Sequence, residues 1–197
     1  MAAKRRAETM EENRAKLIAA ARTAFAEKGF AAASMDELTA SVGLTRGALY
    51  HNFGDKKGLL AAVVAQVDGE MAQRAKAAAS GVADGWEKLV AEGIAYIQLA
   101  MEAEVQRIVL RDGPAFLGDP AQWPSQNSCL EATRETIVKL TESGMIKPVD
   151  ADAAAHLLNS AALNAALWVG ASSEPEKALP KMIEVFTQLA GGLRQSD

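Results

Sequence analysis

The chain has 197 residues, of which 49% are hydrophobic and 23% charged, and its formal net charge is −4. It is long and apolar enough to bury a core, as one compact domain or two small ones. The sequence has no apolar run of bilayer-spanning length, no signal-peptide pattern and a single cysteine, Cys129, which excludes an internal disulfide framework. We therefore expect a cytoplasmic protein without a membrane partner.

The charge is divided unevenly along the chain. Residues 1–66 carry a net charge of +3, whereas residues 67–197 carry −7. This asymmetry is typical of a basic, nucleic-acid-binding head on a body that does not bind nucleic acid. Alanine is abundant and aromatic residues make up only 5% of the chain, so the composition favours helices over strands.

The basic segment opens with about twelve polar residues that show no hydrophobic periodicity, and we expect them to be disordered. A first helix is then predicted up to Gly29, because apolar residues recur at helical spacing: Leu17, Ile18, Ala21 and Phe25. The next helix begins with the capping box Ser34-Met35-Asp36-Glu37 and ends at Gly43. In such a box the Ser34 hydroxyl bonds the Glu37 amide, and the Glu37 carboxylate reaches back.

A third, short helix follows the turn at Gly43, with Thr45 as its N-cap. It carries polar side chains that a buried helix would not use: Thr45, Arg46, Tyr50, His51 and Asn52. Such side chains suit a DNA groove, because phosphates and base edges are hydrogen-bonding surfaces. Asp55 then caps a longer helix. Residues 35–54 thus predict a helix-turn-helix motif within a head over residues 12–66.

Residues 67–197 predict a larger helical body. Apolar residues recur at helical spacing over five segments, at 86–101, 105–109, 130–144, 150–171 and 175–193. Prolines and glycines make the stretch 118–125 an irregular loop. No strand signal or internal repeat is present, so the expected fold is all-α with about nine helices.

Four stretches of the head form a specific pattern: Phe25-x3-Gly29-Phe30, Ser34-Met35-Asp36-Glu37-Leu38, the run from Val42 to Phe53, and Lys56-x2-Leu59-Leu60. In these stretches the chain resembles the TetR family of bacterial transcriptional regulators. The resemblance implies an all-helical homodimer whose heads read adjacent major grooves of a palindromic operator in double-stranded DNA. It also implies a body that binds a small molecule, which releases the DNA, and whose last two helices form a four-helix bundle with those of the partner subunit.

The predicted DNA contacts lie at the start of the short helix and beside it: Ser34, Thr45, Arg46, Gly47, Tyr50, His51 and Lys56. Arg46 can bond guanine or a phosphate, and Lys56 can reach a phosphate on its flexible stem. Gly47 would let the backbone approach the DNA closely. A phosphate contact from Thr39 is a weaker expectation.

A ligand cavity in the body would be mostly apolar with a few polar groups. The large or soft side chains available to line it are Trp86, Tyr96, Met101, Phe116, Trp123, Cys129 and Trp168. A repressor that senses redox state through Cys129 is an alternative. The sequence around Cys129 has no basic cluster, which favours an inert buried thiol.

The last two helices are expected to form the homodimer interface, because amphipathic helices at a chain end need a partner for their apolar face. Small residues allow close approach and larger ones supply area: Ala161, Ala165, Leu179, Ile183, Phe186 and Leu193.

Rival functions have little support in the sequence. An enzyme is not expected, because the chain has only two histidines, His51 and His156, and lacks metal-ligand spacing, a nucleophile elbow and a phosphate loop. No metal or cofactor is expected either. A protein-binding module whose head no longer binds DNA is disfavoured by the cations Arg46 and Lys56. A ligand-independent regulator and an activator remain alternatives within the regulator class.

Overall fold

The computed structural model describes residues 2–195, without the side chains of residues 2–4 and 6. Its α-helices are α1 (Ala2–Lys28), α2 (Met35–Ser41), α3 (Arg46–Phe53), α4 (Lys56–Ala78), α5 (Gly85–Gln98), α6 (Ala103–Val105), α7 (Gly113–Leu117), α8 (Pro124–Glu142), α9 (Ala151–Ala171) and α10 (Pro175–Gly191). The short turns η1 (Leu99–Met101), η2 (Gln106–Asp112, π-helical) and η3 (Pro120–Gln122) complete the set. Over residues 2–195 there is no strand, only an isolated bridge between Ile146 and Arg194. The all-α prediction is confirmed.

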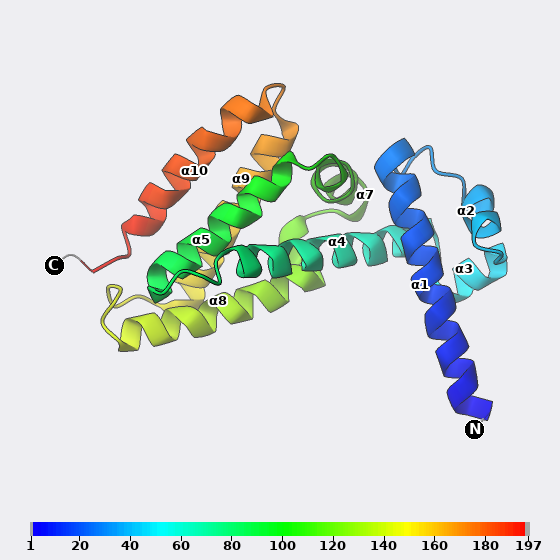
Figure 1. Cartoon of the computed structure of the whole chain (residues 1–197), viewed down its shortest axis with the longest axis horizontal. Coiled ribbons are helices and arrows are strands. Elements are labelled where there is room, and N and C mark those ends of the chain that lie inside the picture. Colours follow the sequence, from blue (N-terminus) through cyan, green and yellow to red (C-terminus); the bar gives the residue numbers. More distant parts are fainter. Residues whose placement is uncertain (1, 196–197) are drawn as a thin grey trace.

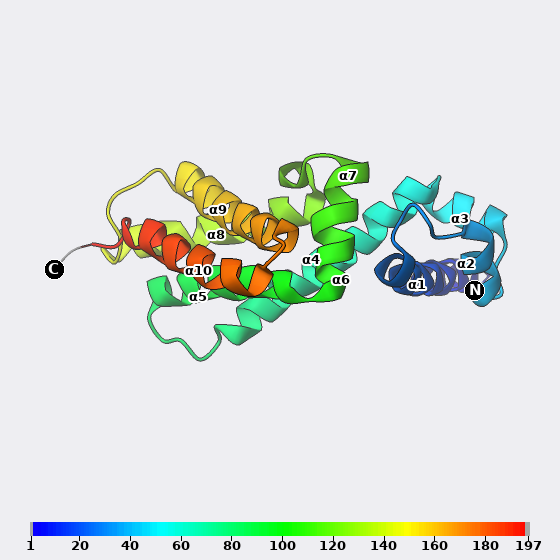
Figure 2. The ribbon, with the colours of Figure 1, turned by 90° about the horizontal axis from the view of Figure 1, so that it is seen from above.

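The helices form a small head and a larger body at opposite ends of an elongated molecule (Figure 1). Helices α1, α2 and α3 make the head, and α5, α8, α9 and α10 make most of the body. Seen from above, α4 runs from the head into the body (Figure 2). Because α4 crosses residues 66 and 67 without a break, the division of the chain at that point stays a prediction.

The expectation of a disordered N-terminal dozen is wrong, because α1 already begins at Ala2. This stretch is rich in alanine, glutamate, lysine and arginine, which are strong helix formers. Residues 7–12 are exposed, so no packing surface imposes a hydrophobic period on them. The absence of periodicity therefore reflects a helix that projects into solvent.

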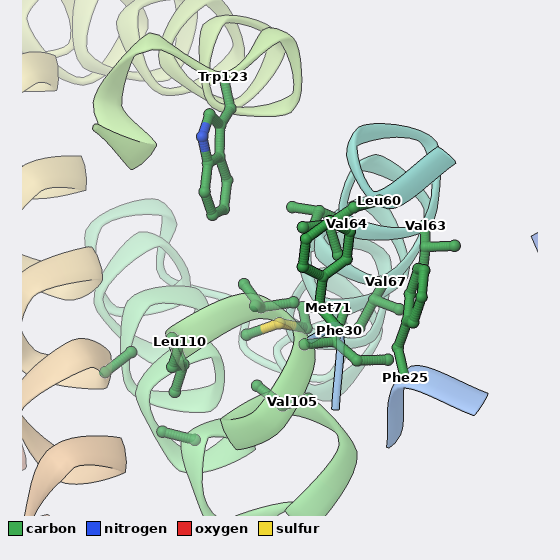
Figure 3. Close-up of a cluster of buried hydrophobic side chains, with 14 of the residues drawn as sticks. Phe25, Phe30, Leu60, Val63, Val64, Val67, Met71, Val105, Leu110 and Trp123 are labelled. Atoms are coloured by element: carbon green, nitrogen blue, oxygen red, sulfur yellow. The ribbon is translucent and has the colours of Figure 1, made fainter. Parts of the chain in front are cut away.

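One hydrophobic core connects head and body (Figure 3). The head contributes Phe25 and Phe30, whose ring centroids lie 5.6 Å apart in an edge-to-face arrangement. Helix α4 contributes a continuous buried stripe: Leu59, Leu60, Val63, Val64, Val67 and Met71. On the body side the Phe116 ring lies 4.4 Å from Phe30. Head and body thus share one packed core at this point.

Polar contacts reinforce the same junction. The Arg22 guanidinium donates to both oxygens of Glu104, at 2.7 and 2.8 Å, and to Glu70 at 2.8 Å. The backbone N–H of Phe30 donates to Asp112 at 2.7 Å. Burial raises the pKa of Glu70, but hydrogen bonds from Gln66 and Arg22 outweigh it, so this pKa lies below its usual 4.5.

Arg22→Met should lower the free energy of unfolding by about 1–2 kcal/mol at pH 7, because it leaves two half-buried carboxylates facing each other. The melting temperature should fall by roughly 2–8 °C. A carboxyl with a depressed pKa stabilises the fold above pH 4.5 and loses that contribution as the pH falls, so the difference from wild type should shrink at about pH 3.5. Arg74→Met, which breaks the more exposed pair with Glu102, is the matched control. Equal thermal melts for the Arg22 variant and wild type at pH 7 would contradict this role.

Candidate DNA-binding surface and ligand cavity

The head is organised by three capped helices. The Ser34 hydroxyl accepts from the Glu37 amide at 3.4 Å, the Thr45 hydroxyl from Ala48 at 3.2 Å, and the Asp55 carboxylate from Gly58 at 2.7 Å. These three N-caps confirm the predicted starts of α2, α3 and α4. The capping box is only half formed, because the Glu37 carboxylate pairs with Lys28 at 2.9 Å instead of reaching back.

The turn between α2 and α3 depends on Gly43, whose φ of +67° lies in the left-handed region that favours glycine. The Leu44 amide then donates back to the Thr39 carbonyl at 2.9 Å. The turn is tight enough to place the start of α3 beside α2, which is the geometry of a helix-turn-helix.

The start of α3 presents its polar side chains to solvent. Thr45, Arg46, Gly47 and His51 are exposed, and Tyr50 is 48% exposed although it is a large aromatic residue. A Cβ at Gly47 would meet only the Thr45 hydroxyl, at 3.6 Å. The backbone at Gly47 is thus open to close approach from outside, as the prediction for a DNA contact requires.

Two predicted contacts are engaged within the head. The Arg46 Nε lies 3.2 Å from Asp36 on α2, with both side chains more than half exposed. The Lys56 ammonium lies 4.6 Å from the centre of the Phe30 ring and donates to the Ala31 carbonyl at 3.3 Å. Partial burial lowers the pKa of Lys56. Either cation can leave its present partner for a phosphate, since Arg46 is more than half exposed and Lys56 is only partly buried.

Thr39 does not face a DNA surface. It is 3% exposed, and its hydroxyl donates to the Met35 carbonyl at 2.9 Å, so the expectation of a phosphate contact there is wrong. Sequence reasoning missed Arg14, which lies 4.7 Å from the Phe53 ring centre and donates to the Asn52 carbonyl at 3.2 Å. The spacing along α1 could have revealed this role. Arg14 lies close to one helical turn before the buried Leu17, so both residues are on the face of α1 that packs on the head.

The body contains a cavity of about 460 Å³ between α4, α5, α8, α9 and α10. Of the seven residues predicted to line it, Trp86, Tyr96 and Cys129 do so. The other four lie elsewhere. Phe116, Trp123 and Met101 pack on the head–body core, and Trp168 is 53% exposed on α9. The prediction selected these residues for the size of their side chains. Size does not distinguish a side chain of the core from one that lines a cavity.

Two polar residues of the lining, Tyr96 and Gln126, form what we call the Asp68 end of this cavity, after the buried carboxylate to which both donate. Asp68, 1% exposed, accepts from the Tyr96 hydroxyl and from the Gln126 amide, each at 2.9 Å. Burial and the nearby Asp68 carboxylate raise the pKa of the Cys129 thiol, while Lys76 partly opposes the shift. A raised pKa disfavours the reactive thiolate, so this geometry gives no support to redox sensing at Cys129.

Comparison with known proteins identifies the family. Residues 17–63 match the bacterial regulatory proteins of the tetR family, and residues 86–193 match the tetracyclin repressor-like C-terminal domain. The chain belongs to the TetR family. It is a TetR-family transcriptional repressor, and members of this family are DNA-binding transcription factors, not enzymes.

Three similar proteins illustrate the relationship. A TetR-family transcriptional regulator from Pectobacterium atrosepticum is 43% identical, with a TM-score of 0.87 over 96% of this chain and 97% of that one. The transcriptional repressor AcnR of Corynebacterium efficiens is 28% identical over 68% of this chain and 69% of its own length. The protein RolR, solved in complex with the ligand resorcinol, is 18% identical with a TM-score of 0.69 over 96% of this chain and 98% of that one, and shares the fold.

Of the six residues predicted for the dimer interface, two are buried within the subunit and four are half-buried. Phe186 is 6% and Ala165 1% exposed, while Ala161, Leu179, Ile183 and Leu193 are partly buried against the subunit's own core. The sequence-based prediction rests on residue size and helical spacing, which do not determine which face of each helix is exposed to solvent. The exposed apolar residues of α9 and α10 are instead Leu157, Trp168, Val185 and Leu189, at 73%, 53%, 49% and 65% exposure.

Two features are absent from the part of the TetR chain that the structure describes. No group of three or more histidine, cysteine, aspartate or glutamate side chains over the described residues is arranged to hold a metal ion. Within residues 2–195, no helix combines the length and apolar character needed to cross a membrane.

Proposed function

We propose that the chain works as a homodimeric repressor that binds a palindromic operator through α2 and α3, and that a small apolar or amphipathic ligand in the body cavity releases it. The observation that carries the DNA-binding part is the exposed start of α3. There the Thr45 cap, the bare backbone at Gly47 and the Arg46 guanidinium all face solvent. A core helix would bury these groups, whereas a recognition helix presents them to a major groove.

The proposed DNA surface joins the seven predicted residues into one set: Ser34, Thr45, Arg46, Gly47, Tyr50, His51 and Lys56. Ser34 and Thr45 would keep their capping bonds, in which the hydroxyl oxygen accepts, and donate their hydroxyl protons to phosphate oxygens. Arg46 would exchange Asp36 for a guanine or a phosphate. Arg14 supports the set from behind, because it ties α1 to the end of α3 through Phe53 and Asn52.

Release by a ligand is supported by the position of α4. Residues Ala72, Ala75 and Lys76 of this helix line the cavity, and its first residue, Lys56, contacts the head. The two heads of a dimer must lie about 34–36 Å apart to fit successive turns of DNA. If the ligand favours a position of α4 that differs from the DNA-bound one, its binding to both subunits would change the distance between the two heads. A nearly complete shift needs roughly 5.5 kcal/mol of differential binding, which two sites can share. RolR, with resorcinol bound, has the same fold.

Binding to DNA can be measured by fluorescence anisotropy with fragments flanking the chain's own gene, at two salt concentrations and with competitor DNA. Selective binding that weakens with salt is the expected result, because phosphate contacts release counterions. Arg46→Ala should weaken operator binding about 10- to 100-fold, the effect of a lost guanine contact. Its melting temperature should stay unchanged, since Arg46 is 54% exposed and its ion pair is exposed as well.

Asp36→Asn is the matched control for Arg46→Ala. Both variants break the same ion pair, but the asparagine variant frees Arg46 and removes a negative charge near the DNA. Operator binding by Asp36→Asn should therefore equal or exceed wild type. A folded Arg46→Ala protein that binds the operator normally would exclude a contact role for Arg46. Equal losses in both variants would show that the ion pair, and not the guanidinium's access to DNA, is what matters.

A further inference from the structure

The cavity in the body has walls of two kinds. Most of it is apolar, with three aromatic or large side chains, Trp86, Phe186 and Leu89, and with Val90 and Leu158 beside them. Its polar lining is confined to a few groups: Tyr96, Gln126, Thr133, Thr136 and Asn159, with lysines and a glutamate at the opening. Some hydrogen-bond donors and acceptors of these groups are not used within the protein. These free donors and acceptors determine which ligand the cavity can bind.

The end next to Asp68 offers acceptors. The Tyr96 hydroxyl donates its one hydrogen bond to Asp68 at 2.9 Å. The Gln126 amide nitrogen donates to Asp68 at 2.9 Å and to the Tyr96 oxygen at 3.4 Å, so both of its protons are used. Tyr96 and Gln126 can then present only oxygen lone pairs to the cavity. A ligand group that meets this end must donate a hydrogen bond, and an anion there would face the Asp68 carboxylate.

Asn159 offers the complementary group. Its side-chain oxygen accepts from the Thr133 hydroxyl at 3.0 Å, while its amide nitrogen is buried without a partner among the described residues. A buried donor left unpaired is costly, so an acceptor oxygen on a ligand would be favourable here.

The opening of the cavity opposes a cation. Lys76 is exposed and Lys88 half-buried where the lining reaches solvent, and Glu92 lies with them. The two lysines outnumber the single carboxylate at this opening. An anion is thus opposed at the Asp68 end and a cation at the opening.

We propose that this cavity binds an uncharged aromatic molecule that carries a hydroxyl group, with the hydroxyl donating to the Tyr96–Gln126 end and the ring packed against Trp86 and Phe186. The inference rests on the proposed ligand-released function, whose effector class it names. A volume of about 460 Å³ suits a molecule of one to three rings.

Three probes of nearly the same shape separate the required features: 2-naphthol, 2-methoxynaphthalene and 2-naphthoate. The first is neutral and donates a hydrogen bond, the second is neutral and only accepts, and the third is an anion. Isothermal titration calorimetry on the full chain at pH 7, without DNA, should show 2-naphthol binding at least about tenfold more tightly than either of the others. Because this measurement needs no operator, its outcome is independent of DNA binding.

Tyr96→Phe tests the assigned acceptor while it keeps the ring. In this variant the preference for 2-naphthol over 2-methoxynaphthalene should fall to within about threefold, with the affinity for 2-methoxynaphthalene unchanged. Thr23→Val, on the exposed surface of α1 and outside the cavity, is the control and should keep the full preference. The wild-type comparison stands alone if the Tyr96 variant does not fold.

Binding of 2-naphthoate or 2-methoxynaphthalene as tight as that of 2-naphthol would overturn the proposal, and so would no binding of any of the three. If the proposal fails while operator binding is intact, the repressor function stands and only the ligand class is wrong. If 2-naphthol binds selectively but no operator is bound, the cavity assignment stands and the proposed function fails.

Discussion

Leu189→Glu is expected to convert the protein into monomers and to lower operator affinity by at least about 100-fold, the range of avidity lost when two linked sites separate. Leu189 is 65% exposed on α10, next to Val185 one helical turn before it. Helix α9 packs beside α10 (Figure 2). It exposes Leu157 and Trp168. If these helices form the proposed two-fold interface, each subunit would bury a carboxylate there without a cation to pair with it.

Thr187→Glu is the matched control for Leu189→Glu. It introduces the same charge on the same helix at another exposed position, but two residues away, which rotates it by about 200° around α10. Sedimentation velocity should show dimers for Thr187→Glu and monomers for Leu189→Glu, with helical circular dichroism preserved in both. A Leu189→Glu protein that remains dimeric would place the interface on another surface.

The local structure of the head could be predicted because each element has a signal of its own. Ser34, Thr45 and Asp55 stand where a helix must satisfy its first amides, and the positive φ at Gly43 is nearly exclusive to glycine. These are short-range rules that do not depend on the rest of the fold. The prediction for the N-terminal stretch is wrong because it relied on hydrophobic periodicity. A helix that is exposed to solvent on all sides has no such period.

The cavity and the interface were harder to predict, because both depend on which elements meet. Asp68 lies on α4, Tyr96 on α5 and Gln126 on α8. No spacing in the sequence predicts that these three side chains are in contact. On α10 the periodicity correctly marks an amphipathic helix. It does not decide which apolar residues face the subunit's own core: Phe186 and Leu189 lie only about 60° apart around the helix, yet the first is 6% and the second 65% exposed.

Phe186→Glu should accordingly destabilise the fold, not simply dissociate a dimer. Phe186 is 6% exposed, and its ring packs so closely on α5 that a Cβ added at Gly93 would lie 2.5 Å from it. Truncating a buried phenylalanine costs about 3–5 kcal/mol, and an unpaired buried carboxylate adds to that cost. We expect the melting temperature to fall by about 10 °C or more.

A graded series separates packing from charge at this position. Phe186→Leu keeps an apolar side chain and should cost about 1–2 kcal/mol, whereas Thr187→Glu places the same carboxylate one residue later in solvent and should leave the thermal melt unchanged. The decisive comparison is between Phe186→Glu and Leu189→Glu, measured by circular dichroism melts and sedimentation velocity together. The structure requires the first to melt early and the second to remain folded as a monomer. A Phe186→Glu protein that is fully folded and monomeric would mean that its ring faces the partner subunit, as size and spacing alone suggest.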